Sequence, residues 1–109
     1  MRDDAEFKRH ADDAIHSVYL ALTAASDDYA YDVSYESGVL TVETKRPRAR
    51  LVVDAHPAAR QIRISSPSRS YKLDWDVVEN EFLLSGTGEN LKEAMEEALS
   101  RHLKEDVAL

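Results

Sequence analysis

Carboxylate side chains gather in the first third of the chain, and their chemistry is that of cation ligands. The acidic residues between positions 3 and 36 are Asp3, Asp4, Glu6, Asp12, Asp13, Asp27, Asp28, Asp32 and Glu36. Carboxylates are hard oxygen ligands that suit Ca²⁺, Mn²⁺, Fe²⁺ or Fe³⁺. Asp12 and Asp13 precede His16 by four and three residues, a spacing that favours a mixed oxygen and nitrogen site on one helix face.

Two simpler interpretations of these carboxylates stay open. Acidic residues near the start of a helix stabilise it through the helix dipole by about 0.3–1 kcal/mol each. A run of charges also commonly forms nothing more than a solvated face. Carboxylates on an open surface, without an enclosing loop, would hold a cation weakly and with little selectivity. His10 and His16 are surface residues in the simplest interpretation.

The sequence contains no recognisable catalytic constellation. It has no cysteine, which excludes thiolate catalysis, disulfides and iron–sulfur clusters held by the chain's own thiolates. The glycines do not form a phosphate-binding loop, and the four histidines lack the spacing of a zinc protease. We therefore predict a protein that acts by binding and is not an enzyme.

Composition restricts the partners of this chain. Its 109 residues suit a single domain spanning positions 1–109. The net charge of -7 repels nucleic acid and attracts cations and basic protein surfaces. No apolar run approaches the roughly 20 residues that a membrane crossing needs, and the first residues lack the apolar core of a secretion signal. We expect a cytoplasmic monomer with no membrane contact.

Hydrophobic periodicity predicts a helix at each end of the chain and short strands between them. Positions 3–25 place Phe7, Ile15 and Leu22 on one helix face. Asn90 and Glu93 have the spacing of a capping box before a closing helix that reaches position 103. The strands predicted from period-two patterns and apolar runs cover positions 29–36, 39–44, 51–54, 61–65, 71–75 and 81–84.

The order of these elements predicts an α+β fold. Ser37-Gly38 signals a tight hairpin turn, and residues 45–50 are interpreted as a basic, proline-bearing connection. Tyr29 is taken as the first residue of the first strand. A run of strands flanked by helices favours two terminal helices packed on one face of an antiparallel sheet of about six strands. The other face of that sheet is then free to meet a partner.

Three segments of the chain resemble the frataxin family. Gln61-Ile-Arg-Ile-Ser-Ser-Pro-Ser68, followed by Tyr71-Lys-Leu-Asp-Trp75, is similar to the central signature of that family. Ala5–Asp12 resembles the opening of its first helix, and Ser37–Val42 resembles its first hairpin. The order and spacing of the segments agree, and the resemblance covers nearly the whole chain. It implies an α-β sandwich of two terminal helices against an antiparallel sheet.

The resemblance also implies a function. Frataxins bind Fe²⁺ and Fe³⁺ weakly through an acidic ridge, and they dock on the cysteine desulfurase and scaffold complex of iron–sulfur cluster assembly. Carried over to this chain, the acidic ridge consists of Glu6, Asp12, Asp13, Asp27, Asp28 and Asp32. The partner-binding residues on the sheet side are Gln61, Arg63, Ser65, Lys72 and Trp75. Arg63 stands where the family has an exposed tryptophan, which changes an aromatic contact into a cationic one.

Two alternatives follow from the same resemblance. A ferroxidase activity has been attributed to some frataxins, so a ferroxidase or iron-storage protein is one alternative. The other is an acidic adaptor of the same fold that has lost iron binding. Many relatives carry carboxylates near the positions of Leu20, Thr23 and Ala24, where this chain has none. A site with fewer oxygen ligands is expected to hold iron more weakly.

Overall fold

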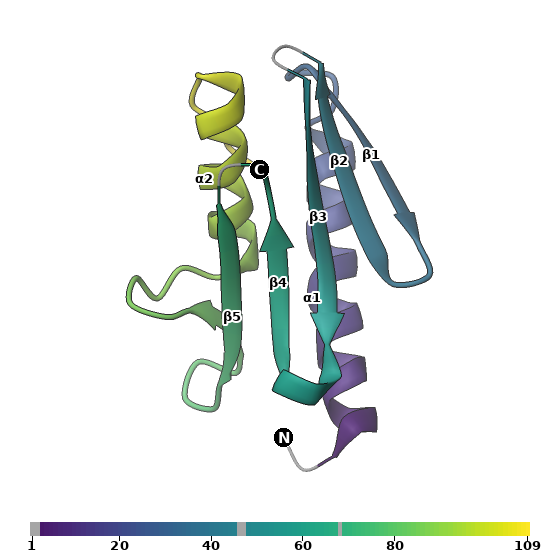
Figure 1. Ribbon diagram of the computed structural model, residues 1–109, viewed down its shortest axis with the longest axis vertical. Helices are drawn as coiled ribbons and strands as arrows, with labels where there is room; N and C mark the ends of the chain where they lie inside the picture. Colours follow the sequence, from purple (N-terminus) through teal and green to yellow (C-terminus); the bar gives the residue numbers. More distant parts are fainter. Residues whose placement is uncertain (1–2, 46–47, 68) are drawn as a thin grey trace.

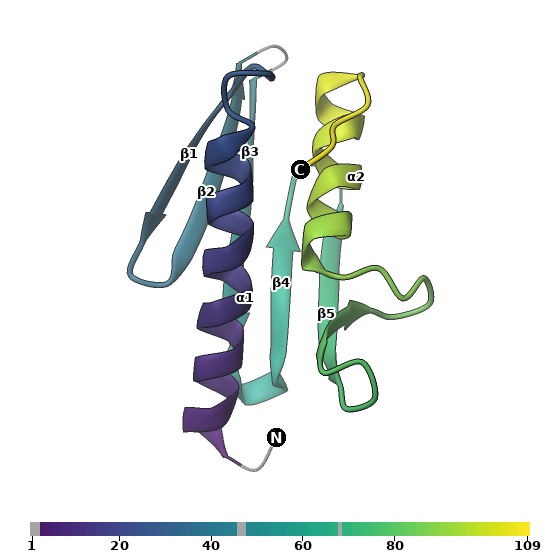
Figure 2. The same ribbon diagram turned by 180° about the vertical axis from the view of Figure 1, so that it is seen from behind.

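The computed structural model describes residues 3–45, 48–67 and 69–109, which form one six-stranded antiparallel sheet and two long helices. The elements are α1 (Asp4–Ala24), β1 (Tyr31–Glu36), β2 (Val39–Lys45), β3 (Arg48–His56), a 3₁₀ turn (Pro57–Ala59), β4 (Gln61–Ser65), β5 (Ser70–Asp76), β6 (Glu81–Leu84) and α2 (Leu91–Leu103). Both helices lie on the same side of the sheet, and its other face is open (Figures 1 and 2). The predicted α+β fold is confirmed.

The first helix forms because its apolar residues recur along one face and its ends are capped. Phe7, Ile15 and Leu22 are fully buried on that face. The Asp3 side chain accepts a hydrogen bond from the Glu6 backbone N–H at 2.8 Å, which satisfies one of the free donors at the helix start. The predicted range of 3–25 differs from the observed helix by one residue at each end.

The sheet is a simple meander in which each strand pairs with the next one along the chain. Glu36 pairs with Val39, so only Ser37 and Gly38 form the loop between β1 and β2. Both residues have positive φ angles, 52° and 79°, as a type I′ hairpin turn requires. The twist of this turn matches that of the two strands, and the predicted hairpin is confirmed.

Two boundaries predicted from the sequence are wrong. The connection predicted at 45–50 is shorter, because β2 continues through Lys45 and β3 already begins at Arg48. Arg46 and Pro47 lie outside the described residues. Arg48 and Arg50 look like loop residues in the sequence, but they are exposed strand residues on the open face of the sheet. Tyr29 precedes β1 and lies in the turn after α1.

The core lies between the helices and the inner face of the sheet. Alternate strand residues point toward the helices and are buried there: Tyr31, Leu40, Val42, Thr44, Leu51, Val53, Ile62, Ile64, Tyr71, Leu73 and Phe82. Each large apolar side chain buried in this way contributes about 1.5–3 kcal/mol. The residues between them, including Arg63 and Lys72, therefore point to the open face.

The second helix starts with the predicted capping box and is the shorter of the two. Asn90 Oδ1 accepts from the Glu93 backbone N–H at 2.9 Å, and Glu93 Oε1 accepts from the Asn90 N–H at 3.0 Å. The segment after α2 turns back, and the Val107 N–H donates to Ser100 Oγ at 3.0 Å. Neither helix, within the residues that the structure describes, has the length and apolar character needed to cross a membrane.

Tyr31 joins the edge strand β1 to the end of α1. Its side chain is 2% exposed, and its hydroxyl donates to the Leu22 carbonyl oxygen at 2.5 Å. Leu22 lies in the last turn of α1, where backbone carbonyls lack partners within the helix. Burial is the main cause that raises the pKa of Tyr31 to about 12, with smaller contributions from Tyr29 and Asp28.

We predict that Tyr31→Phe lowers the free energy of unfolding by about 1 kcal/mol, because the Leu22 carbonyl loses its partner. Thermal unfolding at pH 7 measures this, with Tyr35→Phe as the control because its hydroxyl makes no hydrogen bond within the described part of the chain. The folded state holds the Tyr31 proton more tightly than the unfolded state does. Wild-type stability therefore falls as the pH rises from about 10 to about 12. Equal pH profiles for wild type and Tyr31→Phe would contradict this account.

Candidate functional site

The acidic ridge predicted from the sequence runs along α1 and the neighbouring edge of the sheet. Glu6 lies in the first turn of α1, Asp12 and Asp13 lie near its middle, and Asp27 and Asp28 lie in the turn after it. Asp32 is the second residue of β1, the edge strand beside α1 (Figures 1 and 2). At 1.5 Å per residue the helix separates the two ends of the ridge by about 30 Å. The ridge is therefore an extended surface and not one compact site.

Two members of the ridge face lysines of the chain itself, and a third faces a histidine. Asp12 Oδ2 lies 2.6 Å from Lys8 Nζ, and Asp32 Oδ1 lies 3.7 Å from Lys45 Nζ. Glu6 Oε1 lies 3.9 Å from the imidazole of His10. No ion pair is seen for the exposed Asp13, Asp27 and Asp28 within the described part of the chain. The negative charge available to a partner is therefore concentrated in these three residues.

Lys8 is a member of this surface that the sequence-based assignment missed. Its hydrogen bond to Asp12, together with the charge of Asp12, raises the pKa of Lys8. The spacing of four residues on one helix was the signal that could have predicted this pair. Because the pair is exposed to solvent, it contributes little to stability. Its main effect is to neutralise Asp12 locally.

A hollow of about 640 Å³ lies between the middle of α1 and the β1–β2 turn. Its lining residues are Lys8, Asp12, Asp13, His16, Tyr35, Ser37 and Gly38. Asp12, Asp13 and His16 therefore border one hollow, as their spacing along the helix predicted. The His16 ring centroid lies 6.0 Å from that of Tyr35. Burial, and to a lesser extent Asp12, raises the pKa of Tyr35.

The ridge has ligands of the right chemistry for a hard cation, but they do not converge. Across residues 3–45, 48–67 and 69–109, no group of three or more histidine, aspartate or glutamate side chains is arranged to hold a metal ion. Carboxylates bind Fe²⁺ or Mg²⁺ singly or in pairs when water completes the coordination shell. Such a site on this ridge would be weak and exchangeable.

The other predicted surface is the open face of the sheet. Gln61, Arg63 and Ser65 alternate along β4 with the buried Ile62 and Ile64, so all three lie on this face. Lys72 of β5 is directly opposite Arg63, and Asp74 is directly opposite Gln61. Gln61 Nε2 donates to Asp74 Oδ1 at 3.0 Å. The structure thus brings these four predicted partner residues together.

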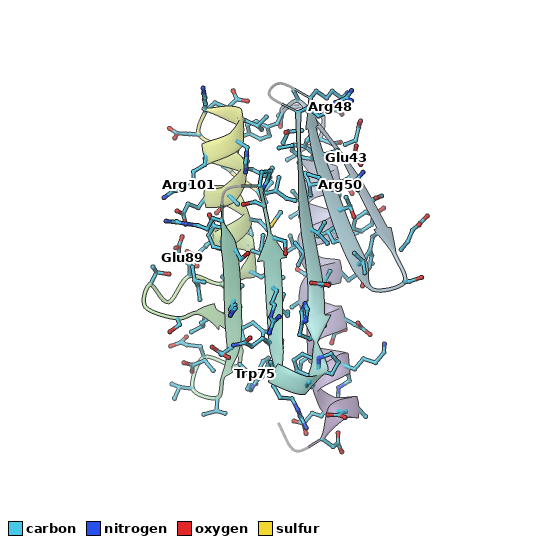
Figure 3. The ribbon with its side chains drawn as sticks, viewed as in Figure 1. Glu43, Arg48, Arg50, Trp75, Glu89 and Arg101 are labelled. Atoms are coloured by element: carbon cyan, nitrogen blue, oxygen red, sulfur yellow. The ribbon has the colours of Figure 1, made fainter. Side chains whose placement is uncertain are left out.

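Trp75 is separate from that group because it lies on the opposite face of the sheet. It alternates with Asp74 and points toward the helices, near the lower end of β5 in Figure 3. Its ring centroid is 5.1 Å from that of Phe82 and 4.3 Å from that of His10. Trp75 closes one end of the core and is half-buried. A partner on the open face would not touch it directly.

We predict that Asp13→Asn raises the melting temperature at low salt, because it removes one charge from an acidic surface and breaks no ion pair among the described residues. Asp12→Asn is the matched control, since it removes the same charge but also the contact with Lys8. The stabilisation by Asp13→Asn should amount to a few tenths of a kcal/mol and vanish above about 0.5 M NaCl. A melting temperature of the wild type that does not respond to salt would contradict this.

Comparisons with known proteins agree with the architecture. A model of the frataxin-like domain matches residues 1–105. The solved structure of frataxin from Psychromonas ingrahamii is similar with a TM-score of 0.73 and 17% identity, covering 96% of this chain and 95% of that one. The trimeric frataxin of the yeast Saccharomyces cerevisiae has a TM-score of 0.69 and 24% identity. The match covers 88% of this chain and 80% of the yeast chain. No curated protein sequence matches the chain.

Proposed function

The chain belongs to the frataxin family, whose members bind iron and take part in iron–sulfur cluster assembly, and on this premise we propose that it is an iron-responsive accessory of that assembly. It acts by binding the cysteine desulfurase and the scaffold protein, not by catalysis. The observation that carries the proposal is the exposed acidic ridge along α1 and β1, in a protein of net charge -7.

The ridge provides an electrostatic contact for a basic surface of the desulfurase. Complementary charges speed the encounter of two proteins and select the orientation in which they meet. Asp13, Asp27 and Asp28 contribute most to this attraction, because no cation of the described chain neutralises them. The response to iron follows from the same charges. Fe²⁺ bound to the ridge cancels part of its charge and weakens the attraction to the desulfurase.

The open face of the sheet contacts the scaffold in this proposal. Gln61, Arg63, Ser65 and Lys72 share that face, and neither helix covers it (Figure 1). The ridge residues of α1 lie on the helix side of the sheet, whereas Asp32 alternates with the buried Tyr31 and lies on the open face. One protein can therefore contact desulfurase and scaffold together.

An acidic adaptor without iron binding is the second candidate, and the ion pairs in the ridge favour it. Lys8 Nζ already lies 2.6 Å from Asp12 Oδ2, so iron that binds Asp12 must displace the lysine ammonium. A ferroxidase has less support, because a di-iron centre needs several convergent carboxylates. The ridge carboxylates are instead distributed along α1, the following turn and β1.

We predict that Fe²⁺ added without oxygen broadens the backbone amide signals of Asp12, Asp13 and Asp32 before those of β4 and β5. Heteronuclear NMR measures this, because paramagnetic iron broadens only nearby signals. Asp13→Asn should weaken the effect severalfold, and Glu105→Gln, an exposed charge beyond α2, should leave it unchanged. If the amide signals of the ridge do not broaden and the protein still binds the desulfurase normally, the adaptor without iron binding is favoured.

We also predict that the double charge reversal Asp13→Lys with Asp27→Lys weakens binding to purified desulfurase by at least about tenfold at low salt. The matched control is Glu105→Lys with Asp106→Lys, which changes the net charge equally in the exposed segment after α2. Calorimetry at two salt concentrations distinguishes the loss of a local contact at the ridge from an effect of the protein's overall charge. Equal losses for the two double variants would contradict docking through the ridge.

A further inference from the structure

The two edge strands of the sheet differ in how the chain covers them. On the outer side of β6, the Leu84 N–H donates to the Glu89 carbonyl oxygen at 2.7 Å, and Leu83 forms an antiparallel bridge with Asn90. β1 pairs with β2 on one side, and no described residue forms a strand on its other side. Both views show β1 at the margin of the sheet (Figures 1 and 2). The edge at β1 is therefore open to another chain.

The backbone groups that point away from β2 belong to alternate residues of β1. In a two-residue hairpin, the pair that flanks the turn exchanges hydrogen bonds, and bonded and non-bonded pairs then alternate along the strands. Glu36 belongs to that flanking pair. The Lys45 N–H, which donates to the Ala30 carbonyl oxygen at 3.1 Å, fits the same alternation. Val33 and Tyr35 therefore direct their N–H and carbonyl groups to the free edge, where an added strand would pair with them.

The charges beside this edge determine which strand it accepts. Asp32 and Glu36 of β1 are exposed on the open face of the sheet, and Asp13 is exposed on α1. Lys45 Nζ lies 3.7 Å from Asp32, but no ion pair of Glu36 or Asp13 is found among the described residues. A second copy of β1 would bring the same carboxylates close together, and like charges on paired strands destabilise a sheet. The edge therefore disfavours its own copy and favours a basic strand.

The hollow beside this edge has room for a side chain of the added strand. It is bordered by Lys8, Asp13 and Tyr35, and the Tyr35 ring centroid lies 5.4 Å from that of Tyr19. Alternate side chains of a strand next to β1 would point to this helix-side flank. There a guanidinium or ammonium group can contact both an aromatic ring and a carboxylate. Lys8 is already engaged with Asp12 at 2.6 Å, so Asp13 is the carboxylate that an incoming cation meets.

We propose that β1 binds an extended basic segment of a partner protein as an additional strand of the sheet. The segment carries lysines or arginines at alternate positions. Its backbone pairs with Val33 and Tyr35, and its cations lie beside Asp32 and Glu36 on the open face. A further cation on the helix side enters the hollow near Asp13. This inference goes beyond the proposed function, because it specifies how a segment attaches, whichever protein supplies it.

The test uses the peptide acetyl-Arg-Val-Arg-Val-Arg-Val-amide and hydrogen exchange measured by NMR. At a peptide concentration about ten times its Kd, exchange of the Val33 and Tyr35 amides should slow about tenfold, because only the unbound protein then exposes them. The Ser34 amide, which already faces β2, should slow less. The peptide acetyl-Arg-Pro-Arg-Pro-Arg-Pro-amide has the same charge but lacks half of the N–H donors, so it should not protect these amides. Equal protection by both peptides would overturn the proposal.

Two variants of the protein test the backbone and the charges separately. Val33→Pro removes one outward N–H, which proline can do on an edge strand without breaking the ladder to β2. It should weaken binding of the arginine–valine peptide about fivefold in calorimetry. Asp13→Asn with Glu36→Gln, which leaves the backbone intact, should also weaken it about fivefold or more. The matched control, Glu105→Gln with Asp106→Asn, removes the same charge beyond α2 and should keep the affinity within about twofold.

The remaining outcomes identify other occupants of the edge. Unchanged affinity in both the backbone and the charge variant would overturn the proposal. Protection of the Val33 and Tyr35 amides that rises with protein concentration, without peptide, would place a second copy on β1 and would also overturn it. If the peptide protects these amides but the desulfurase does not bind, strand addition stands and the proposed function fails.

Discussion

The packing of the apolar stripe of α1 against the inner face of the sheet is the constraint on which every surface of this protein depends. Phe7, Ile15 and Leu22 are fully buried there, so the helix cannot rotate without exposing them. Asp13 must then lie outside the core. Tyr31 adds a directional restraint, because its hydroxyl joins the edge strand to the last turn of the helix. The helical part of the acidic ridge is the solvent-facing side of a helix whose other side packs on the sheet.

The alternation of side chains along the strands determines which residues form the open face. Successive strand residues point to opposite sides, so a shift of one residue in the pairing of β4 would send Arg63 toward the core and Ile64 to solvent. The burial of Ile62 and Ile64 rules out such a shift energetically. Arg63 and Lys72 are therefore held on the open face, with Asp54 and Asp74 at neighbouring positions of β3 and β5.

Charge along the ridge is less uniform than a count of acidic residues implies. Lys8 and Lys45 lie beside Asp12 and Asp32, while Asp13 and Asp28 face solvent without such a neighbour in the described structure. A cation or a basic partner therefore meets strong and weak positions within a few ångströms of each other. Because these pairs are exposed, a competing ion can displace the lysines at little cost. This arrangement suits weak, reversible association.

The sequence by itself determined the fold class, the hairpin turn, the capping box of the second helix and the inward or outward direction of most strand residues. These features follow from local periodicity and short-range hydrogen bonds, such as those between Asn90 and Glu93. It did not reveal the strand at Arg48 and Arg50, because outward-facing arginines have the composition of a loop. Only the tertiary structure placed Trp75 behind the sheet and set Arg63 against Lys72. Strand register decides such neighbours, and register arises from pairing between segments and from packing on the helices, not from the residues of one strand.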